Sequence, residues 1–273
     1  MTDTFTPAAD PASQALLQHQ DERGVLTLTL NRPDKRNAFD DSLISQLTDA
    51  LQQADNNAAV RAVVLTSTGE HFSAGADLNW MKRMAAYTHE QNLTDALALA
   101  GLMNTLYSLS KPTLALVRGA AYGGAVGLAA CCDMVIAADN ASFCLSEVRI
   151  GLIPATISPF VLRAIGERQA RRYFLTAEII TASKAVELGL AHSCVPADQV
   201  AAEADALLKA LLGNSPAAIS AAKHLISSVS GEPIDQALLQ DTSQRIADIR
   251  VSVEGQEGLS AFLEKRAPAW RQH

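Results

Sequence analysis

Two short stretches rich in glycine and alanine, FSAGADL at residues 72–78 and RGAAYGGAVGL at residues 118–128, carry most of the information in this chain. Each follows an apolar run typical of a buried strand, VRAVVLTST before the first and PTLALV before the second. Side chains this small let a backbone N–H come close to a bound ligand. Two such N–H groups that converge on one point form an oxyanion hole, which stabilises charge on a carbonyl or thioester oxygen.

Composition limits the classes of function. The chain has 273 residues, of which 48% are hydrophobic and 19% charged, as in a soluble globular protein with a large core. A net charge of −7 argues against a general nucleic-acid binder, which needs a basic face. The cysteines and the scattered histidines lack ligand spacing, so we expect no metal site and read the adjacent pair Cys131 and Cys132 as buried, reduced thiols.

Neither the N-terminal segment nor the longest apolar run of the sequence points to a membrane. Residues 1–20 lack a basic segment followed by an apolar one, and we expect a flexible tail rather than a secretory signal. The longest apolar run, residues 113–138, is interrupted by Arg118 and Asp133 and is rich in glycine and alanine. We therefore expect a soluble, cytoplasmic protein with no membrane partner.

Hydrophobic periodicity predicts alternating strands and helices up to about Val195. We expect strands at residues 24–31, 60–66, 113–117, 133–138 and 142–145. We expect helices at residues 41–56, after Asp77, after the second Gly/Ala stretch, and at 159–165, 167–175 and 184–189. Asp40 or Asp41 is the expected N-cap of the first helix, and Gly189 the end of the last.

Beyond Val195 the pattern is helical throughout, with expected helices at residues 201–214, 215–227, 234–250 and 252–266. The domain division is therefore an α/β core at residues 21–195 followed by a helical region at residues 196–273. Pattern alone favours a doubly wound sheet for the core.

A third feature, Glu147 in FCLSEVRIGLIP at residues 143–154, makes the constellation specific. In this order the three features resemble the crotonase (enoyl-CoA hydratase/isomerase) superfamily, over residues 24–266. The resemblance implies a spiral of repeated ββα units with a C-terminal helical region that forms a homotrimer or a hexamer, a dimer of trimers. It also implies an acyl-CoA thioester as substrate, with no cofactor besides that coenzyme A.

The resemblance assigns catalytic roles to three residues. The backbone N–H groups of Ala76 and Gly124 would hold the thioester oxygen, and Glu147 would be the general acid/base. The apolar residues that flank Glu147 should raise its proton affinity. The alternatives are that both turns only permit tight packing and that Glu147 is a surface glutamate on a loop.

One position departs from the pattern of typical hydratases, which carry a second glutamate where this chain has Gly127. Single-glutamate enoyl-CoA isomerases, which only move a proton between carbons, are therefore the alternative function. Yet residues 119–161 look like bacterial hydratases of 3-methylglutaconyl-CoA and isohexenylglutaconyl-CoA, enzymes of leucine/isovalerate and acyclic terpene degradation that share this glycine. Our hypothesis is hydration of such a substrate by Glu147, helped by the substrate's terminal carboxylate or by Tyr122.

The resemblance also places residues that contact the substrate. Lys35 or Arg36 would lie near the coenzyme A phosphates, with the backbone at Ser73 and Ala74 bordering the adenine. Phe262 and Lys265 would contact the nucleotide, often from a neighbouring subunit. Asp77, beside the oxyanion alanine, is read as a helix N-cap rather than an acid catalyst.

A terminal carboxylate needs a cationic or amide partner in the acyl pocket. The candidates are Asn79, Lys82, Arg83 and Arg149, although Lys82 and Arg83 could equally form a solvated helix face. Trp80 fits a pocket wall or plain core. A non-catalytic acyl-CoA-binding or RNA-binding protein of the same superfamily is a further alternative, which the negative charge and the retained Glu147 count against.

Overall fold

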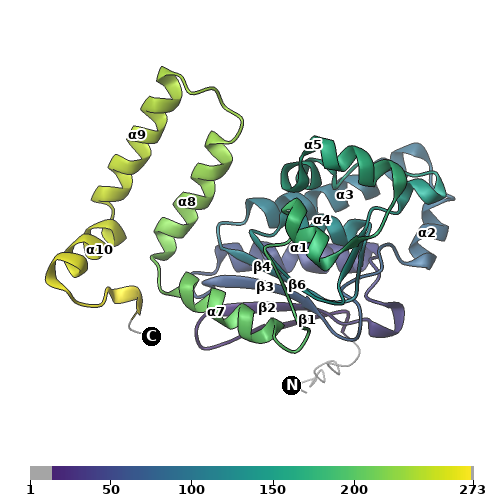
Figure 1. Cartoon of the computed structure of the whole chain (residues 1–273), viewed down its shortest axis with the longest axis horizontal. Coiled ribbons are helices and arrows are strands. Elements are labelled where there is room, and N and C mark those ends of the chain that lie inside the picture. Colours follow the sequence, from purple (N-terminus) through teal and green to yellow (C-terminus); the bar gives the residue numbers. More distant parts are fainter. Residues whose placement is uncertain (1–13, 272–273) are drawn as a thin grey trace, which may run out of the picture.

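The computed structural model describes residues 14–271 and is built on a six-stranded sheet in the order β1-β2-β3-β4-β6-β9 (Figure 1). Its strands are β1 Leu16–Gln20, β2 Val25–Leu30, β3 Ala62–Ser67, β4 Thr113–Val117, β6 Met134–Ala138 and β9 Ser193–Val195. All neighbours are parallel except β1 and β2. The central strands read as continuous Val, Leu and Ala runs because both faces of the sheet are covered.

A second, smaller sheet joins β5 Ala120–Tyr122, β7 Ser142–Cys144 and β8 Ile180–Thr181. Two isolated parallel bridges, Phe39 to Ala76 and Ser73 to Ala121, continue it towards the earlier turns of the chain. Successive turns therefore place a strand in the large sheet, a short extended segment in the small sheet, and then a helix. This arrangement confirms the crotonase-type spiral of ββα units, and the doubly wound sheet favoured by pattern alone is wrong.

Helices cover both faces of the large sheet. The helices of the core are α1 Asp41–Asn56, α2 Leu78–Met84, α3 His89–Ser108, α4 Gly124–Cys131, α5 Ser158–Thr176, α6 Ala182–Leu188 and α7 Val200–Leu212. Apolar side chains of α1, α3, α4 and α5 join the main core cluster, whereas α7 packs on the opposite face with Val64, Leu114 and Ile136. Three short 3-10 turns complete the described chain at Pro33–Lys35, Glu147–Ile150 and Ala269–Arg271.

Local signals in the sequence account for several boundaries. Asp40 caps α1, since its side chain accepts a hydrogen bond from the Leu43 amide at 2.9 Å. Gly189, at φ 83°, ends α6 in the left-handed conformation. The two helices expected between residues 159 and 175 are both present, and they run together as α5 with a kink at Gly166, where φ is 74°.

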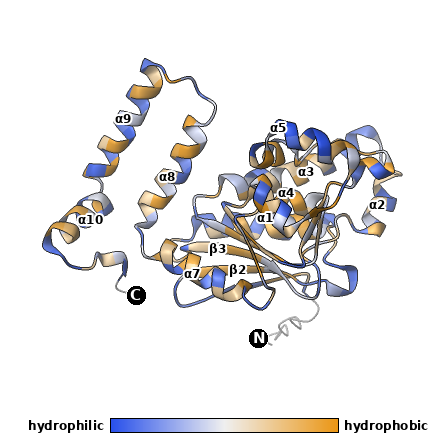
Figure 2. Ribbon diagram, viewed as in Figure 1, coloured by the Kyte–Doolittle hydropathy of each residue, from blue (hydrophilic) through white to orange (hydrophobic). Residues whose placement is uncertain are grey.

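The last helices form an arm. Helices α8 Pro216–Val229, α9 Gln236–Val251 and α10 Val253–Glu264 extend away from the core (Figure 1), and within residues 14–271 no side chain of α8 or α9 is buried. Figure 2 shows apolar residues along these uncovered helices. Lys223 of α8 anchors the arm, since its Nζ lies 2.7 Å from Asp133 Oδ2 at the start of β6 and 3.1 Å from the carbonyl of Lys111.

The structure corrects the predicted tail. Residues 16–20, assigned to that tail, form β1 and pair antiparallel with β2, while residues 1–13 lie outside the described part of the chain. The short strands β5, β8 and β9 were also not predicted, because two or three residues show no usable periodicity. Across the described residues, no helix has the length and apolarity needed to cross a membrane.

Replacing Asp40 by alanine should lower the free energy of unfolding by about 1–2 kcal/mol, because the variant loses the helix cap and the partner of Arg32. Denaturant unfolding followed by circular dichroism measures the change. Asp49→Ala, at an exposed position of the same helix, is the control and should change stability by less than about 0.5 kcal/mol. Equal losses in both variants would show that the cap contributes nothing.

Candidate active site

The first part of the site is the loop at residues 73–77, which follows β3 and is held by the turn at residues 36–39. The Ala74 amide donates to the Arg36 carbonyl at 2.9 Å, and the amides of Phe39 and Asp77 donate to the carbonyls of Gly75 and Phe39, each at 2.7 Å. Gly75 has φ 98°, a conformation that side chains rarely permit. The loop is therefore fixed on this side by three backbone hydrogen bonds.

The second part is the turn at residues 122–124, which joins β5 to α4. It lies against the first loop, because the Ser73 amide donates to the Ala120 carbonyl at 2.9 Å and the Tyr122 amide donates to the Ser73 carbonyl at 3.0 Å. Gly123 has φ 54° and precedes the first residue of α4, Gly124. The two Gly/Ala stretches, about forty residues apart in sequence, are thus neighbours in space.

Two amides at this junction are left without partners. Among residues 14–271, neither the Ala76 nor the Gly124 N–H makes a hydrogen bond, although the amides on either side of Ala76 are paired. Phe39 borders both, with its backbone bridged to Ala76 and its ring 3.7 Å from the position of a Cβ on Gly124. Gly124 begins α4, so its N–H carries the partial positive charge of a helix N-terminus.

Glu147 lies beside the second turn. Its Oε1 is 3.3 Å from the position a Cβ on Gly123 would occupy, and the Gly123 amide donates to the Cys144 carbonyl at 2.9 Å, three residues before Glu147. The other oxygen, Oε2, is buried and has no hydrogen-bond partner within the described chain. Burial raises the pKa of the Glu147 carboxyl above its ordinary value, as the apolar flanking sequence predicted.

Gly127 marks the position where a second glutamate would stand. A Cβ on Gly127 would lie 2.3 Å from Cγ2 of Ile157 and 3.2 Å from Cε of Met103. Apolar packing therefore fills the space next to this residue, and Ile157 would have to move to admit any side chain. At this junction Glu147 is the carboxyl group whose pKa burial raises.

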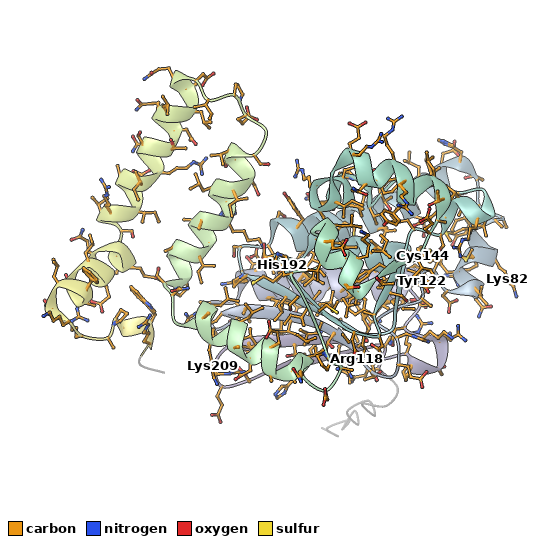
Figure 3. The ribbon with its side chains drawn as sticks, in the orientation of Figure 1. Lys82, Arg118, Tyr122, Cys144, His192 and Lys209 are labelled. Atoms are coloured by element: carbon orange, nitrogen blue, oxygen red, sulfur yellow. The ribbon has the colours of Figure 1, made fainter. Side chains whose placement is uncertain are left out.

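Tyr122 does not contact Glu147 by a hydrogen bond. Its hydroxyl lies 3.4 Å from Oγ of Ser142 on the neighbouring strand β7. Cys144, the partner of Tyr122 in the pairing of β5 with β7, is buried, and burial raises the pKa of its thiol. Figure 3 shows Tyr122 and Cys144 close together on the part of the core that faces away from the arm.

The predicted coenzyme A cations border the first loop. Lys35 and Arg36 are exposed, and Lys35 Nζ lies 3.6 Å from Asp77 Oδ2. Asp77 is the N-cap of α2, as predicted, with its side chain accepting from the amides of Asn79 and Trp80. Although burial alone would raise its pKa, these amides and the charges of Lys35 and Arg32 hold the pKa of the Asp77 carboxyl below its ordinary value.

The acyl-pocket candidates differ in their partners. Trp80 is buried in the main core cluster, and its Nε1 donates to Asp95 Oδ1 at 3.0 Å. Arg83 pairs with Asp41, and Arg149 donates to the Ala177 carbonyl. Asn79 and Lys82 are both exposed. Lys82 has no ion-pair partner in the described residues and lies on the outer side of α2 (Figure 3).

Phe262 and Lys265 are not brought to this site by their own chain. Both are exposed, at the end of α10. That helix belongs to the arm, on the opposite side of the core from α2 and Tyr122 (Figures 1 and 3). A single chain thus supplies the two turns, Glu147 and the basic turn, but not the C-terminal pair.

Two residues that the sequence analysis did not select help to build the first loop. Arg32 lies 3.3 Å from Asp77 and 2.6 Å from Asp40. Asn37 is buried at φ 54° and donates to the carbonyls of Thr68 and His71, both at 2.8 Å. The Pro-containing turn between a strand and a helix was the available signal, but it does not show which of its polar side chains turn inward.

No group of metal-binding side chains occurs in the described part of the chain.

Comparison with known proteins identifies the family. Residues 20–273 match the family model described as enoyl-CoA hydratase/isomerase. Two curated relatives are similar over nearly their whole length. The 2,3-dehydroadipyl-CoA hydratase of Escherichia coli is 35% identical over 253 residues, which cover 92% of this chain and 96% of the relative. The mevalonyl-coenzyme A hydratase of Aspergillus fumigatus is 33% identical over 268 residues, which cover 96% of this chain and 97% of the relative.

A solved structure agrees with these relatives. The crystal structure of an enoyl-CoA hydratase from Shewanella pealeana matches with a TM-score of 0.91 at 50% identity, covering 94% of this chain and 96% of that one. The chain therefore belongs to the enoyl-CoA hydratase/isomerase family, the crotonase superfamily. Within that family these relatives are named as hydratases of acyl-CoA thioesters, and the chain is an enzyme of the general class of enoyl-CoA hydratases.

Introducing a methyl group with Gly127→Ala should destabilise the protein by about 1–3 kcal/mol, because the new Cβ overlaps Ile157. Thermal or denaturant unfolding measures the loss. Adding Ile157→Ala removes the overlapping Cγ2, so the double variant should lose less stability than the sum of the two single variants. The matched control is Gly101→Ala in α3, where nothing lies within 4 Å of the new Cβ and helix propensity should raise stability by about 0.5–1 kcal/mol. Equal behaviour of the two variants would contradict the packing described at Gly127.

Glu147→Gln should stabilise the fold at pH 8 by about 1 kcal/mol, since it removes the negative charge of a carboxyl whose Oε2 is buried without a partner within residues 14–271. The pKa of Glu147 is higher in the folded state than in the unfolded state. The charged carboxylate therefore destabilises the fold fully at a pH above the folded-state pKa, and it has no such effect at a pH below the unfolded-state pKa. The stability difference between variant and parent should therefore shrink as the pH falls towards 4. A Glu147→Gln variant that is less stable than the parent at pH 8 would show that the carboxylate has a stabilising partner.

Proposed function

We propose that the enzyme hydrates a 3-branched 2-enoyl-CoA that ends in a carboxylate, with Glu147 as its acid/base residue. The observation that carries this proposal is the carboxyl of Glu147. Its Oε2 is buried without a partner within residues 14–271, and its Oε1 lies beside Gly123, in the turn that carries the free amide of Gly124. A carboxyl with a raised pKa is suited to exchange protons near neutral pH.

In the proposed reaction the thioester oxygen accepts hydrogen bonds from the amides of Ala76 and Gly124. These donors stabilise the enolate that forms as water adds at C3. Glu147 takes a proton from the attacking water and returns a proton to C2, so that the net reaction adds H and OH across the double bond. One carboxyl performs both transfers on one face of the substrate, and no cofactor besides the coenzyme A of the substrate takes part.

A second candidate is enoyl-CoA isomerisation, and Gly127 is the observation that favours it. With Ile157 packed against Gly127, the usual second glutamate has no space. A single carboxyl is enough to move a proton between C2 and C4. The names of the relatives favour hydration, and the substrate carboxylate is our proposed helper for orienting the water. Tyr122, the other helper considered, has its hydroxyl beside Ser142 instead.

The proposed substrate class draws on two relatives. The Escherichia coli relative is named for 2,3-dehydroadipyl-CoA, the thioester of a dicarboxylic acid, and the Aspergillus fumigatus relative for mevalonyl-CoA, which is branched at C3. We propose 3-methylglutaconyl-CoA or isohexenylglutaconyl-CoA, and thus a role in leucine/isovalerate or acyclic terpene degradation. Asn79 and Lys82 of α2 are our candidate partners for the terminal carboxylate, because Arg83 and Arg149 already have partners.

For the coenzyme A moiety we propose contacts from both the core and another subunit. Lys35 and Arg36 would bind phosphates, and the backbone at Ser73 and Ala74 would border the adenine. Phe262 and Lys265 would reach the nucleotide of a neighbouring subunit in a trimer or a hexamer. The arm supports this arrangement, since no side chain of α8 or α9 is buried within residues 14–271 and apolar residues lie along these helices (Figure 2).

Purified protein should consume the conjugated enoyl thioester of 3-methylglutaconyl-CoA or isohexenylglutaconyl-CoA, and Glu147→Gln should reduce kcat by about 10²–10⁴-fold. The loss of near-ultraviolet absorbance of the conjugated thioester measures the rate. Glu167→Gln, at an exposed position of α5, is the control and should leave the rate unchanged. The acid limb of the pH–rate profile should lie above the ordinary glutamate pKa, because the carboxylate form starts hydration.

Three outcomes would contradict the proposal. Full activity in Glu147→Gln would remove Glu147 from the chemistry. Conjugation that appears from a 3-enoyl-CoA, without hydration of any 2-enoyl-CoA, would make the enzyme an isomerase. Binding of acyl-CoA or of RNA without turnover would assign a binding role. Faster hydration of crotonyl-CoA, which lacks the carboxylate, would overturn only the proposed substrate class.

A further inference from the structure

Behind the loop that presents the Ala76 amide lies the turn at residues 32–39, and Arg32 is its most enclosed cation. The guanidinium donates to Asp40 Oδ2 from Nη1 at 2.6 Å and to Asp77 Oδ2 from Nη2 at 3.3 Å. The side chains of Arg32 and Asp77 are only 13% and 8% exposed. Little solvent screens this pair, unlike the ion pairs on the surface.

The two carboxylates that Arg32 joins are both helix caps. Asp40 caps α1, and Asp77 caps α2 by accepting from the amides of Asn79 and Trp80. Asp77 is also the residue after Ala76, and its amide is bonded to the Phe39 carbonyl at 2.7 Å. Both the side chain and the backbone of Asp77 are therefore fixed, which leaves the preceding peptide little freedom.

Asn37 sets the position of Arg32 relative to the loop. Its Oδ1 accepts from the Arg32 amide at 2.7 Å, while its Nδ2 donates to the carbonyls of Thr68 and His71. The residue is 1% exposed and has φ 54°, a conformation that asparagine tolerates better than most side chains. The turn that carries Arg32 is thus joined to the segment that leads into the Ala76 loop.

Lys35 makes a different kind of contact with the same carboxylate. Its Nζ is 3.6 Å from Asp77 Oδ2, and its side chain is 45% exposed. A half-exposed lysine can turn towards a phosphate, whereas the enclosed fork of Arg32 stays on Asp77. The cluster therefore separates a cation that can bind ligand from one that maintains the loop.

We propose that Arg32 is a positioning residue for the reaction: by holding Asp77, it keeps the amide of Ala76 directed at the thioester oxygen. This inference rests on the proposed function, because it requires the Ala76 amide to be an oxyanion donor. A displacement of about 1 Å in such a donor is enough to cost about 100-fold in rate.

Arg32→Gln should lower kcat by about 10- to 100-fold with little change in KM, because Arg32 acts on the donor and not on bound coenzyme A. Arg32→Lys should recover part of the rate. Asp77→Asn keeps an oxygen for capping but loses the charge, and should show the same loss of kcat. The matched control is Arg23→Gln, which also removes an arginine paired with two carboxylates, Asp21 and Asp205, but far from the site, and should leave kcat unchanged.

A spectroscopic measurement separates positioning from general loss of structure. A bound 3-ketoacyl-CoA forms an enolate when its thioester oxygen is stabilised, and the enolate absorbs in the near ultraviolet. At saturating ligand, Arg32→Gln should show a smaller enolate signal than the parent while binding with similar affinity. Where Arg32→Gln is poorly folded, Arg32→Lys and Asp77→Asn give the same test.

The outcomes distinguish this inference from the proposed function. If the parent protein forms no enolate and hydrates no enoyl-CoA, the proposed function fails. If the parent forms the enolate and the Arg32 variants form it equally, or raise KM with kcat unchanged, the positioning role is wrong. If Arg23→Gln loses as much kcat as Arg32→Gln, the effect is one of stability and the inference is also overturned.

Discussion

Hydrogen bonds between successive turns of the chain place every part of the candidate site. Phe39 bridges to Ala76, Ser73 bridges to Ala121, and β5 pairs with β7, so the segment that follows each short strand emerges at the same edge of the small sheet. The first of these segments carries the Ala76 amide, the next the Gly124 amide, and the last Glu147. Each residue comes from a different turn of the spiral, and the ladder of backbone bonds holds the three turns together.

This ladder leaves polar groups at the candidate site without a hydrogen-bond partner in the described chain. Within residues 14–271 the amides of Ala76 and Gly124 have no hydrogen-bond partner, and neither does the buried Oε2 of Glu147, although buried polar atoms normally have one. Their surroundings are tightly packed, with Phe39 against Gly124 and Ile157 against Gly127. Unpaired donors beside an unpaired acceptor are what a thioester and a water molecule require, so we interpret these unsatisfied groups as belonging to function.

Much of this could be predicted from the sequence. The long helices, the four central strands β2, β3, β4 and β6 of the large sheet and the cap at Asp77 follow from periodicity and capping chemistry, and the spiral topology came from resemblance. The short strands β5, β8 and β9 were missed because two or three residues carry no period, and β1 because it lay in a polar N-terminal segment. Arg32 and Asn37 were missed because sequence does not show which polar side chains of a turn face inward. Trp80 was left undecided, and only its contact with Asp95 and its burial place it in the core.

The most direct test of the account is a crystal structure of the protein with a saturated acyl-CoA, which binds without reacting. We predict that the thioester oxygen lies about 2.7–3.1 Å from the amides of both Ala76 and Gly124. We also predict that the Glu147 carboxyl faces C2 and C3 of the acyl chain. A thioester oxygen bound elsewhere, or a Glu147 carboxyl turned away from these carbons, would contradict the claim that three turns of the spiral form one active site.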